Sequence, residues 1–204
     1  MSKENLLIIF TKNAVLGKVK TRLAKGVGDK KALEVYKFLL KHTKDVTSKL
    51  NVNKQVYYAW NIAEKDIWED GGFQKRLQVE GDLGEKMEAA FKAGFDEGYK
   101  KILIIGSDLY DLNTTDLENA FEELEAHDYV IGPAEDGGYY LLGMKSLNSA
   151  LFINKAWSTS SVFEQSLQDM RDGTYKALPL KNDIDTLEDI KGHPAFQKMI
   201  NNDR

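Results

Sequence analysis

The stretch KKILIIGSDLYDL, residues 100–112, joins an apolar run directly to a Gly-Ser-Asp sequence. The run 102–105 predicts the middle of a buried strand, because a strand covered on both faces is apolar throughout. Asp108 then stands where that strand would leave its sheet. A turn is one explanation for this carboxylate. A metal site is the other, because carboxylates at strand ends are oxygen ligands suited to Mg²⁺ or Mn²⁺.

Segments with strand and helix patterns alternate on both sides of this stretch. Strands are expected at 6–11, 55–60, 101–105, 128–134, 139–144 and 175–180, with a short one at 77–80. Helices are expected over 28–50, 64–70, 82–99, 113–125 and 160–170. The alternation predicts an α/β fold with a mostly parallel sheet between two helical layers. No repeat or linker divides the pattern, so we expect one domain over residues 1–204.

The composition excludes several classes of protein. Of the 204 residues, 42% are hydrophobic and 29% are charged, which is typical of a globular protein rather than a disordered one. The net charge of -4 gives no overall attraction to nucleic acid, so no nucleic-acid partner is expected. The absence of cysteine excludes disulfides and cysteine nucleophiles, and it suits a cytoplasmic protein. No apolar stretch is long enough to span a membrane.

Three loops leave predicted strands at their carboxyl ends, at 12–22, 106–112 and 132–138. In open α/β sheets, ligands bind beyond the carboxyl ends of the strands. We therefore expect the three loops to converge on one site.

The first of these loops is rich in basic residues. The sequence TKNAVLGKVKTRLAKGVG, residues 11–28, carries cations at Lys12, Lys18, Lys20, Arg22 and Lys25. Gly17 could let backbone N–H groups approach a phosphate, while lysine and arginine supply positive charge. The alternative is an ordinary solvated basic loop. The loop does not match the P-loop pattern, because Gly17-Lys18 is followed by valine rather than serine or threonine.

The sequence GPAEDGGYYLLG, residues 132–143, places an acidic residue in a glycine-rich turn. Asp136 could be a base, a ligand or a turn former, and Gly137 and Gly138 permit the close approach of a ligand. A hairpin through 135–138 would need the same residues. On physical grounds alone, the hairpin is the favoured interpretation.

The sequence NDIDTLEDI, residues 182–190, contains two alternating carboxylates. In an extended chain, Asp183 and Asp185 would share a face and could complete a metal site with Asp108. The alternative is that Asp185 or Thr186 caps a helix that starts near residue 187. Both interpretations can hold together.

Six motifs, in this order along the chain, carry a family resemblance. They are GKVKTRLA, GDLGEKM, GSDLYDL, GPAEDGGYYLLG, AWSTSSV and DIDTLEDI. Together they resemble the radical-SAM/selenodomain-associated transferase family, which belongs to the nucleotide-diphospho-sugar transferase superfamily with the GT-A fold. The chain is also similar to 2-phospholactate guanylyltransferase and, more distantly, to molybdenum cofactor guanylyltransferase. The resemblance spans residues 10–190.

The resemblance implies a phosphate-binding role for the basic loop. Gly17, Lys18, Lys20 and Arg22 match the family's loop that holds the nucleotide phosphates. The predicted nucleotide- and phosphate-binding set is Lys12, Gly17, Lys18, Lys20, Thr21, Arg22 and Ser107. A segment at 81–84 matches a part of the family near the nucleotide.

The resemblance also implies a metal site and an acceptor side. Asp108 matches the acidic residue that ligates a divalent ion, and Asp183 and Asp185 match a second acidic motif that supplies a further ligand. The implied cofactor is Mg²⁺ or Mn²⁺. The segment formed by Asp136, Gly137 and Gly138 matches the acceptor side.

The chain departs from the family pattern in two places. Family members usually have a proline near Ala14, and a Cys-Pro pair after the acidic residue where this chain has Leu109-Tyr110. Proline fixes φ, so its loss could loosen the loop that directs Asp108.

These observations predict a metal-dependent transferase that uses a nucleotide or nucleotide-sugar donor and a small-molecule acceptor. Lys20 and Arg22 would neutralise charge on the leaving group beside Asp108. The reaction is either nucleotidyl transfer from an NTP or glycosyl transfer, for which Asp136 would be the base. One alternative is a nucleotide-binding module that has lost turnover, which the Leu109-Tyr110 pair suggests. A structural partner protein that binds no nucleotide is another.

Overall fold

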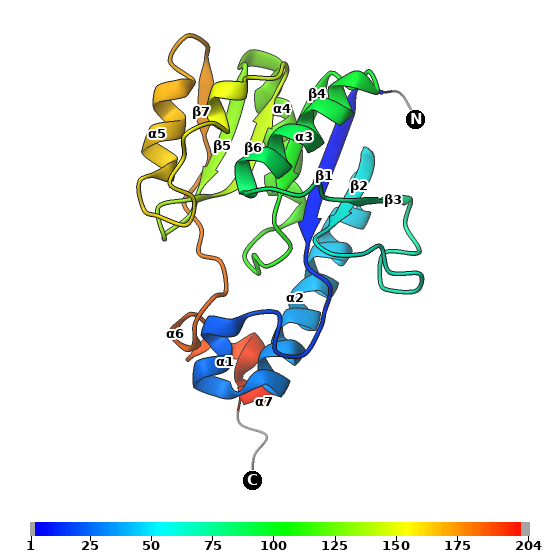
Figure 1. The fold of residues 1–204 in the computed structure, drawn as a ribbon, viewed down its shortest axis with the longest axis vertical. Helices are drawn as coiled ribbons and strands as arrows, with labels where there is room; N and C mark the ends of the chain where they lie inside the picture. Colours follow the sequence, from blue (N-terminus) through cyan, green and yellow to red (C-terminus); the bar gives the residue numbers. More distant parts are fainter. Residues whose placement is uncertain (1–2, 201–204) are drawn as a thin grey trace.

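A seven-stranded sheet forms the centre of the molecule in this computed structural model, which describes residues 3–200 (Figure 1). The expected domain over 1–204 therefore includes ends that lie outside the described residues. The strands are β1 (Asn5–Thr11), β2 (Asn53–Tyr58), β3 (Phe73–Leu77), β4 (Lys101–Ile105), β5 (Tyr129–Pro133), β6 (Tyr139–Met144) and β7 (Tyr175–Ala177). Their order across the sheet is β3-β2-β1-β4-β6-β5-β7.

The strands are parallel except at β6, which pairs antiparallel with β4 on one side and with β5 on the other. The β5–β6 connection is the hairpin favoured from sequence, because the Ala134 amide donates to the Gly138 carbonyl at 3.0 Å. Since β5 runs in the same direction as β1 and β4, the hairpin turn lies at the carboxyl edge of the sheet. The loops after β1, β4 and β5 therefore share one edge.

Helices cover both faces of the sheet. Side chains from α2 (Asp29–Ser48) and α4 (Thr114–Ala126) form a core with one face. Those from α3 (Leu83–Asp96), η1 (Ser149–Leu151) and α5 (Val162–Asp169) pack on the other. In β1, Leu7 and Ile9 belong to the first core, while Leu6 and Ile8 belong to the second. This two-sided burial explains the continuous apolar runs, and it confirms the predicted three-layer α/β/α arrangement.

A small helical lobe extends beyond the carboxyl edge of the sheet (Figure 1). It contains α1 (Thr21–Val27), α6 (Leu187–Ile190), α7 (Pro194–Ile200) and the first part of α2. These elements share a separate hydrophobic cluster, here called the small core. Its buried members are Leu23, Ala32, Val35, Leu39, Ile184, Ile190 and Phe196.

Two of the helices begin at the residues expected to cap them. The Asp82 side chain accepts a hydrogen bond from the Glu85 amide at 2.9 Å, and the Glu85 side chain accepts one from the Asp82 amide at 2.8 Å. Asn113 and Asp116 make the same reciprocal pair at the start of α4. Each pair satisfies two amide groups that a helix start leaves without partners.

Three local expectations were wrong. Residues 64–70 form turns rather than a helix, because the Asp66 carboxylate accepts hydrogen bonds from the Trp68 amide and the Tyr58 hydroxyl. The short strand expected at 77–80 lies earlier, as β3, and is an edge strand with little apolar burial. The basic segment 11–28 is not a loop throughout, because its second half forms α1.

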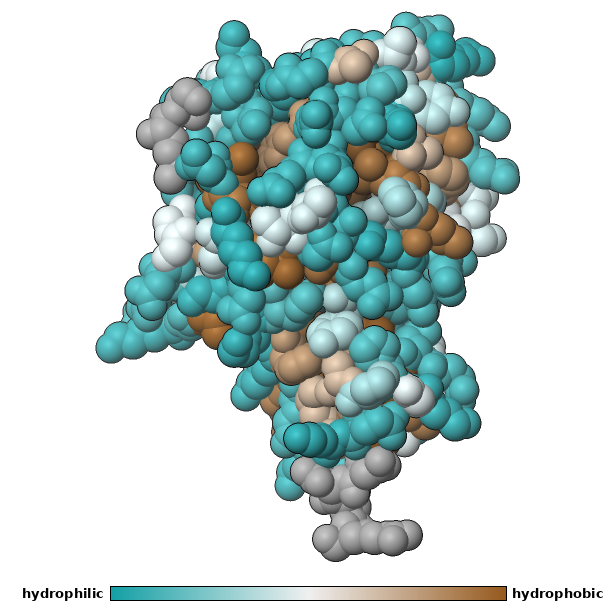
Figure 2. Space-filling view, turned by 180° about the vertical axis from the view of Figure 1, so that it is seen from behind, coloured by the Kyte–Doolittle hydropathy of each residue, from teal (hydrophilic) through white to brown (hydrophobic). Residues whose placement is uncertain are grey.

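The face of the molecule in Figure 2 is mostly hydrophilic, with hydrophobic side chains scattered over it rather than gathered in one area. Among residues 3–200, no helix combines the length and the apolar character needed to cross a bilayer.

Candidate active site

Three carboxylates meet at the carboxyl edge of the sheet. Asp108 follows β4, and Asp183 and Asp185 lie on the segment between β7 and α6. One oxygen from each of the three lies within 4.8 Å of the others, an arrangement that could hold a metal ion. We call these three residues the acid cluster. The structure thus brings together the metal ligands predicted from sequence.

Backbone hydrogen bonds hold the second acidic segment against the first. Lys181 forms an isolated parallel bridge with Ala134, and its carbonyl accepts from the Glu135 amide at 3.1 Å. Between Asp183 and Asp185, the Ile184 amide donates to the Asp108 carbonyl at 3.3 Å. The acid cluster is therefore assembled by main-chain contacts with the hairpin turn and with the Asp108 loop.

Lys20 lies inside the acid cluster. Its ammonium contacts Asp108 Oδ2 at 2.8 Å and Asp185 Oδ1 at 3.0 Å, and only 4% of its side chain is exposed. Burial lowers the pKa of Lys20, but attraction to Asp108 and Asp185 outweighs this and raises it overall. Lys20 also has a left-handed backbone (φ 47°) at the start of α1, which is uncommon outside glycine.

The carboxylates of the acid cluster differ in their electrostatics. Burial favours the protonated form of Asp108, but the charges of Lys20 and Lys12 and the Lys20 hydrogen bond lower its pKa. For Asp183, burial and the nearby charges of Asp108, Asp136 and Asp185 raise the pKa to about 6, although Lys20 opposes this. The cluster thus holds more negative charge than Lys20 compensates.

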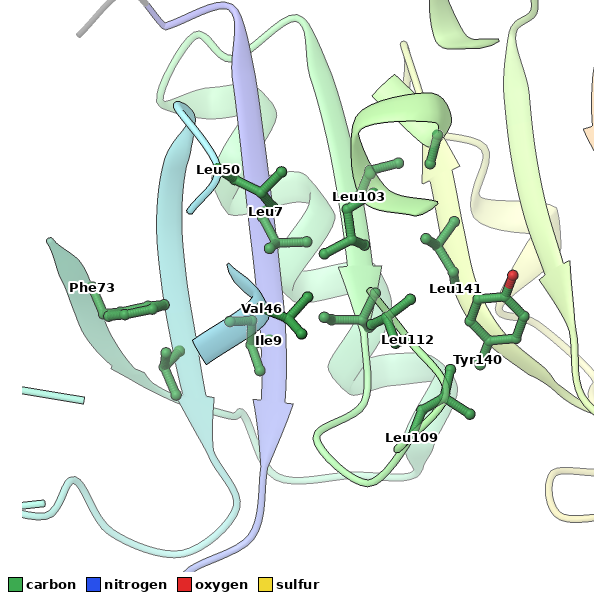
Figure 3. Close-up of a cluster of buried hydrophobic side chains, with 14 of the residues drawn as sticks. Leu7, Ile9, Val46, Leu50, Phe73, Leu103, Leu109, Leu112, Tyr140 and Leu141 are labelled. Atoms are coloured by element: carbon green, nitrogen blue, oxygen red, sulfur yellow. The ribbon is translucent and has the colours of Figure 1, made fainter. Parts of the chain in front are cut away.

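The Asp108 loop is anchored by the two residues that follow it. Leu109 is buried in the first core and points toward the same cluster as Leu7 and Leu103 (Figure 3). Tyr110 packs on the other side against the small core. Its ring centroid lies 5.5 Å from that of Phe38 and 5.1 Å from that of Phe196. Packing on both sides holds the loop, so the absence of a proline does not leave it loose.

The small core connects the elements that carry the site. Leu23 of α1 lies three residues after Lys20, and Ile184 lies between Asp183 and Asp185. Both are buried together with Phe196 of α7. The basic and acidic residues of the site are therefore fixed to one shared apolar cluster.

A cavity of about 190 Å³, here called the acidic cavity, adjoins the acid cluster. Its lining includes three acidic residues, Asp108, Asp136 and Asp183. It also includes the side chains of Tyr139, Trp157 and Val162.

A second cavity, of about 430 Å³, lies beside the carboxyl ends of β1 and β2 and is called the β1–β2 cavity. Lys12, Asn13, Tyr58 and Asn61 contribute to its lining. The side-chain amide of Asn13 donates to the Asn61 backbone carbonyl at 2.8 Å, which joins the loops after the two strands. Lys12 both lines this cavity and lowers the pKa of Asp108, so it connects the two parts of the edge electrostatically.

The comparison that decides the family is a sequence match. The family described as "Uncharacterized protein conserved in bacteria (DUF2064)" matches residues 42–159, more than half of the chain. The chain belongs to this family. No curated protein matches it.

Solved structures agree with the fold of this DUF2064 chain. A presumptive nucleotide-diphospho-sugar transferase from Desulfovibrio desulfuricans G20 is 29% identical, with a TM-score of 0.86 over 97% of this chain and 91% of that chain. The inositol-1-phosphate CTP transferase from T. maritima is 16% identical, with a TM-score of 0.60 over 97% and 96%. A Mycobacterium tuberculosis H37Rv protein in complex with manganese is 13% identical, with a TM-score of 0.57 over 98% and 99%. The fold is that of the nucleotide-diphospho-sugar transferases.

The other residues predicted for the DUF2064 site lie at varying depth. Arg22 reaches the acid cluster, with Nη1 at 3.1 Å from Asp185 Oδ2. Lys12, Gly17, Lys18 and Thr21 are exposed. Within residues 3–200, neither Lys18 nor Thr21 makes a hydrogen bond or ion pair with the acid cluster. Their predicted phosphate contacts stay predictions.

Ser107 faces the interior rather than the edge. Its Oγ lies 3.3 Å from Thr11 Oγ1 and 3.4 Å from the Tyr36 hydroxyl. Burial raises the pKa of Tyr36, which donates to the Lys12 carbonyl at 3.0 Å. This buried group of hydroxyls joins the ends of β1 and β4 to α2. The Ser107 hydroxyl is therefore already hydrogen-bonded within the protein.

Two aromatic residues were not predicted as part of the site. Trp157 was given no role beyond its place in a family motif, and Tyr139 was predicted only as part of a strand, yet both line the acidic cavity. Trp157 belongs to AWSTSSV, one of the six motifs behind the family resemblance, so the motif was the available signal. Gly84, in another of those motifs, packs against it: a Cβ there would lie 2.9 Å from Trp157 Nε1.

Proposed function

We propose that this DUF2064 chain is a metal-dependent transferase that uses a nucleotide-activated donor. The observation that carries the proposal is the convergence of Asp108, Asp183 and Asp185 with Lys20 and Arg22 at the carboxyl edge of this fold. The structural neighbours, which are named as transferases, support a transferase activity. The association with radical-SAM or selenodomain proteins is part of the proposal.

The acid cluster suits a hard divalent cation. Three carboxylates can each offer an oxygen. The pKa of Asp183 is raised first by burial and then by the charges of Asp108, Asp136 and Asp185, so a nearby cation would favour its ionised form. Asp108, Asp183 and Asp185 would hold Mg²⁺ or Mn²⁺. When bound, the ion would neutralise charge on the donor phosphates. The M. tuberculosis neighbour in complex with manganese supports this choice.

Lys20 and Arg22 would act on the donor phosphates. Both cations are now paired with carboxylates of the acid cluster. A metal ion would compete with them for the same carboxylates, which would free their donors for phosphate oxygens. Arg22 is 62% exposed and can turn toward a ligand, whereas Lys20 is held by the start of α1. Arg22 is therefore the mobile cation and Lys20 the fixed one.

The β1–β2 cavity is the proposed place for the base of the donor. It has room for a ring system, and the backbone and amide groups of Asn13 and Asn61 can offer hydrogen bonds. Lys12 stands between this cavity and the acid cluster, where the phosphates of a bound nucleotide would pass. The T. maritima neighbour's name includes CTP, which supports a nucleotide donor.

The acceptor would occupy the acidic cavity. If a hydroxyl attacks, its O–H bond breaks as the new O–P or O–C bond forms, and pyrophosphate or a nucleoside diphosphate leaves. Asp136 is the proposed base for the released proton. One of its oxygens accepts from the Gly138 amide at 2.9 Å, and no other hydrogen bond to its carboxylate occurs in the described part of the chain. If an acceptor phosphate attacks instead, no such base is needed.

A binding module without turnover is the second candidate. The observation that favours it is Lys20, which already occupies two carboxylates of the acid cluster and could take the place of a metal ion. The firm anchoring of the Asp108 loop by Leu109 and Tyr110 argues against a degraded site.

The test is an assay for product release. The protein is incubated with NTPs or nucleotide sugars, Mg²⁺ or Mn²⁺, and a small-molecule extract. We expect release of pyrophosphate or nucleoside diphosphate with the wild type and its loss, by at least about 100-fold, in Asp108→Ala. Asp111→Ala, an exposed neighbour outside the acid cluster, is the matched control. Nucleotide binding without release under any condition would leave the binding module as the function.

A further inference from the structure

We propose that the acidic cavity selects an uncharged or cationic acceptor with an apolar ring or chain, and that it rejects phosphorylated acceptors. This inference rests on the proposed function and names the class of acceptor. It comes from the chemistry of the cavity lining, which combines carboxylates with aromatic surface.

The charge of the lining is one-sided. Asp108, Asp136 and Asp183 contribute carboxylates, and the lining contains no lysine, arginine or histidine among the described residues. Lysines on the adjoining segments are already paired: Lys155 with Asp169, and Lys181 with Asp116. A phosphate in this cavity would thus meet none of the lysine or arginine side chains that usually bind it.

The proposed metal ion would offset the charges of Asp108 and Asp183, which are its ligands, but not that of Asp136, which lies outside the acid cluster. Of the cations of the site, Arg22 would turn toward the donor phosphates while Lys20 stays at the acid cluster. Asp136 makes no ion pair among residues 3–200, so its charge stays uncompensated on the acceptor side. Asp136 is exposed, so solvent partly screens its repulsion of a phosphate, but no cation in the described part of the chain opposes that repulsion. A second phosphate beside Asp136 and a bound nucleotide would therefore bind weakly.

The rest of the lining suits an apolar body with hydroxyl groups. Leu83, Tyr139, Trp157 and Val162 supply apolar and aromatic surface. The indole N–H of Trp157 is buried against Gly84 without a hydrogen-bond partner in the described part of the chain, so Trp157 offers the cavity apolar ring surface rather than a donor. The Tyr139 hydroxyl lies 3.7 Å from Met87 Sδ, a weak acceptor, so it can donate to a ligand oxygen.

The cavity walls are held together by the hairpin turn. Gly137 has φ +86°, and a Cβ there would lie 2.4 Å from the backbone of Ser160. The Phe163 amide donates to the Gly137 carbonyl at 2.9 Å. The turn that carries Asp136 and the segment that carries Trp157 are thus fixed against each other, so the carboxylate and the aromatic surface form one preformed site.

The test uses three probes that share an aromatic ring. Phenyl β-D-glucoside is neutral, tyramine is a cation and phenyl phosphate is an anion. Binding of each to the full-length protein is measured by saturation-transfer NMR and calorimetry, with and without Mg²⁺ and nucleotide. We expect the neutral and cationic probes to bind at least about tenfold more tightly than phenyl phosphate. Trp157→Leu should weaken the binding of the neutral probe.

A charge change separates electrostatics from shape. Asp136→Lys should weaken the binding of tyramine and strengthen the binding of phenyl phosphate. Glu135→Lys, on the same turn but outside the lining, should change the binding of neither probe. Equal or tighter binding of phenyl phosphate to the wild type would overturn the inference, as would the absence of binding by all three probes. If the probes bind as predicted but no nucleotide binds, the proposed function fails while the cavity's preference stands.

Discussion

At the scale of single residues, the acid cluster contains two carboxylates whose pKa values shift in opposite directions. Asp108 is held ionised by Lys20 and Lys12, which outweigh its burial. Asp183 has a pKa raised to about 6 by burial and by the charges of Asp108 and the other carboxylates. Because its pKa is raised, ionised Asp183 should lower the free energy of unfolding at neutral pH. Such unfavourable electrostatics are common in active sites.

The pH dependence of stability tests this. An ordinary aspartate in the unfolded chain has a pKa of about 3.9, so between about pH 4 and pH 6 the folded protein keeps a proton that the unfolded chain has released. The contribution of Asp183 to the free energy of unfolding therefore falls as the pH rises through this window. We predict that Asp183→Asn melts at a higher temperature than the wild type at pH 7.5 and at a similar temperature at pH 4.

Thermal denaturation across this pH range gives the comparison, with Asp111→Asn as the control for loss of an exposed carboxylate. A lower melting temperature for Asp183→Asn than for the wild type at pH 7.5 would contradict the assignment.

At the scale of the elements, the site depends on the small core. Leu23 of α1, Ile184 of the acidic segment and Phe196 of α7 are buried together, and Tyr110 of the Asp108 loop packs against them. Helix α7 contributes no group to the acid cluster. Because it packs in the small core, we still expect it to affect metal binding. Changes in packing outside the ligand set can shift the relative positions of the ligands by enough to change the affinity for the metal ion.

Two buried phenylalanines make a matched pair for this prediction. Phe196→Leu should lower the free energy of unfolding by about 1–2 kcal/mol and also weaken Mn²⁺ binding. Phe91→Leu, in the core on the α3 face of the sheet, should cost similar stability and leave Mn²⁺ binding unchanged. Chemical denaturation and a metal titration measure the two effects. If both variants weaken Mn²⁺ binding equally, the small core has no special role in positioning the site.

The elements also show where sequence patterns stop being informative. The runs in β1 and β4 were predictable because both faces of these strands are buried. Strand β3 was misplaced because an edge strand that is mostly exposed carries no apolar run. Helix α1 was missed because it is short and its only fully buried residue is Leu23, so it lacks a repeating apolar face.

At the scale of the whole molecule, the parallel strands bring loops that are distant in sequence to one edge. The β1–β2 cavity, Lys12, the acid cluster and the acidic cavity all lie at this edge. The convergence of the loops after β1, β4 and β5 could be predicted, because ligands of this fold class bind beyond the carboxyl ends of the strands. The meeting of Asp108 with Asp183 and Asp185 was predicted from the alternation of these two residues and from the family resemblance. The aromatic lining of the acidic cavity could not, because Tyr139 and Trp157 come together only through the packing of two separate segments.

The most direct test of the account is an equilibrium titration of Mn²⁺ followed by electron paramagnetic resonance at pH 7.5. We predict that the wild type binds Mn²⁺, that Asp185→Asn weakens binding at least about tenfold, and that Asp111→Asn does not change it. Lys20→Met should bind Mn²⁺ more tightly, because its ammonium no longer competes for Asp108 and Asp185. Equal Mn²⁺ affinity in the wild type, Asp185→Asn and Lys20→Met would show that the acid cluster is not a metal site.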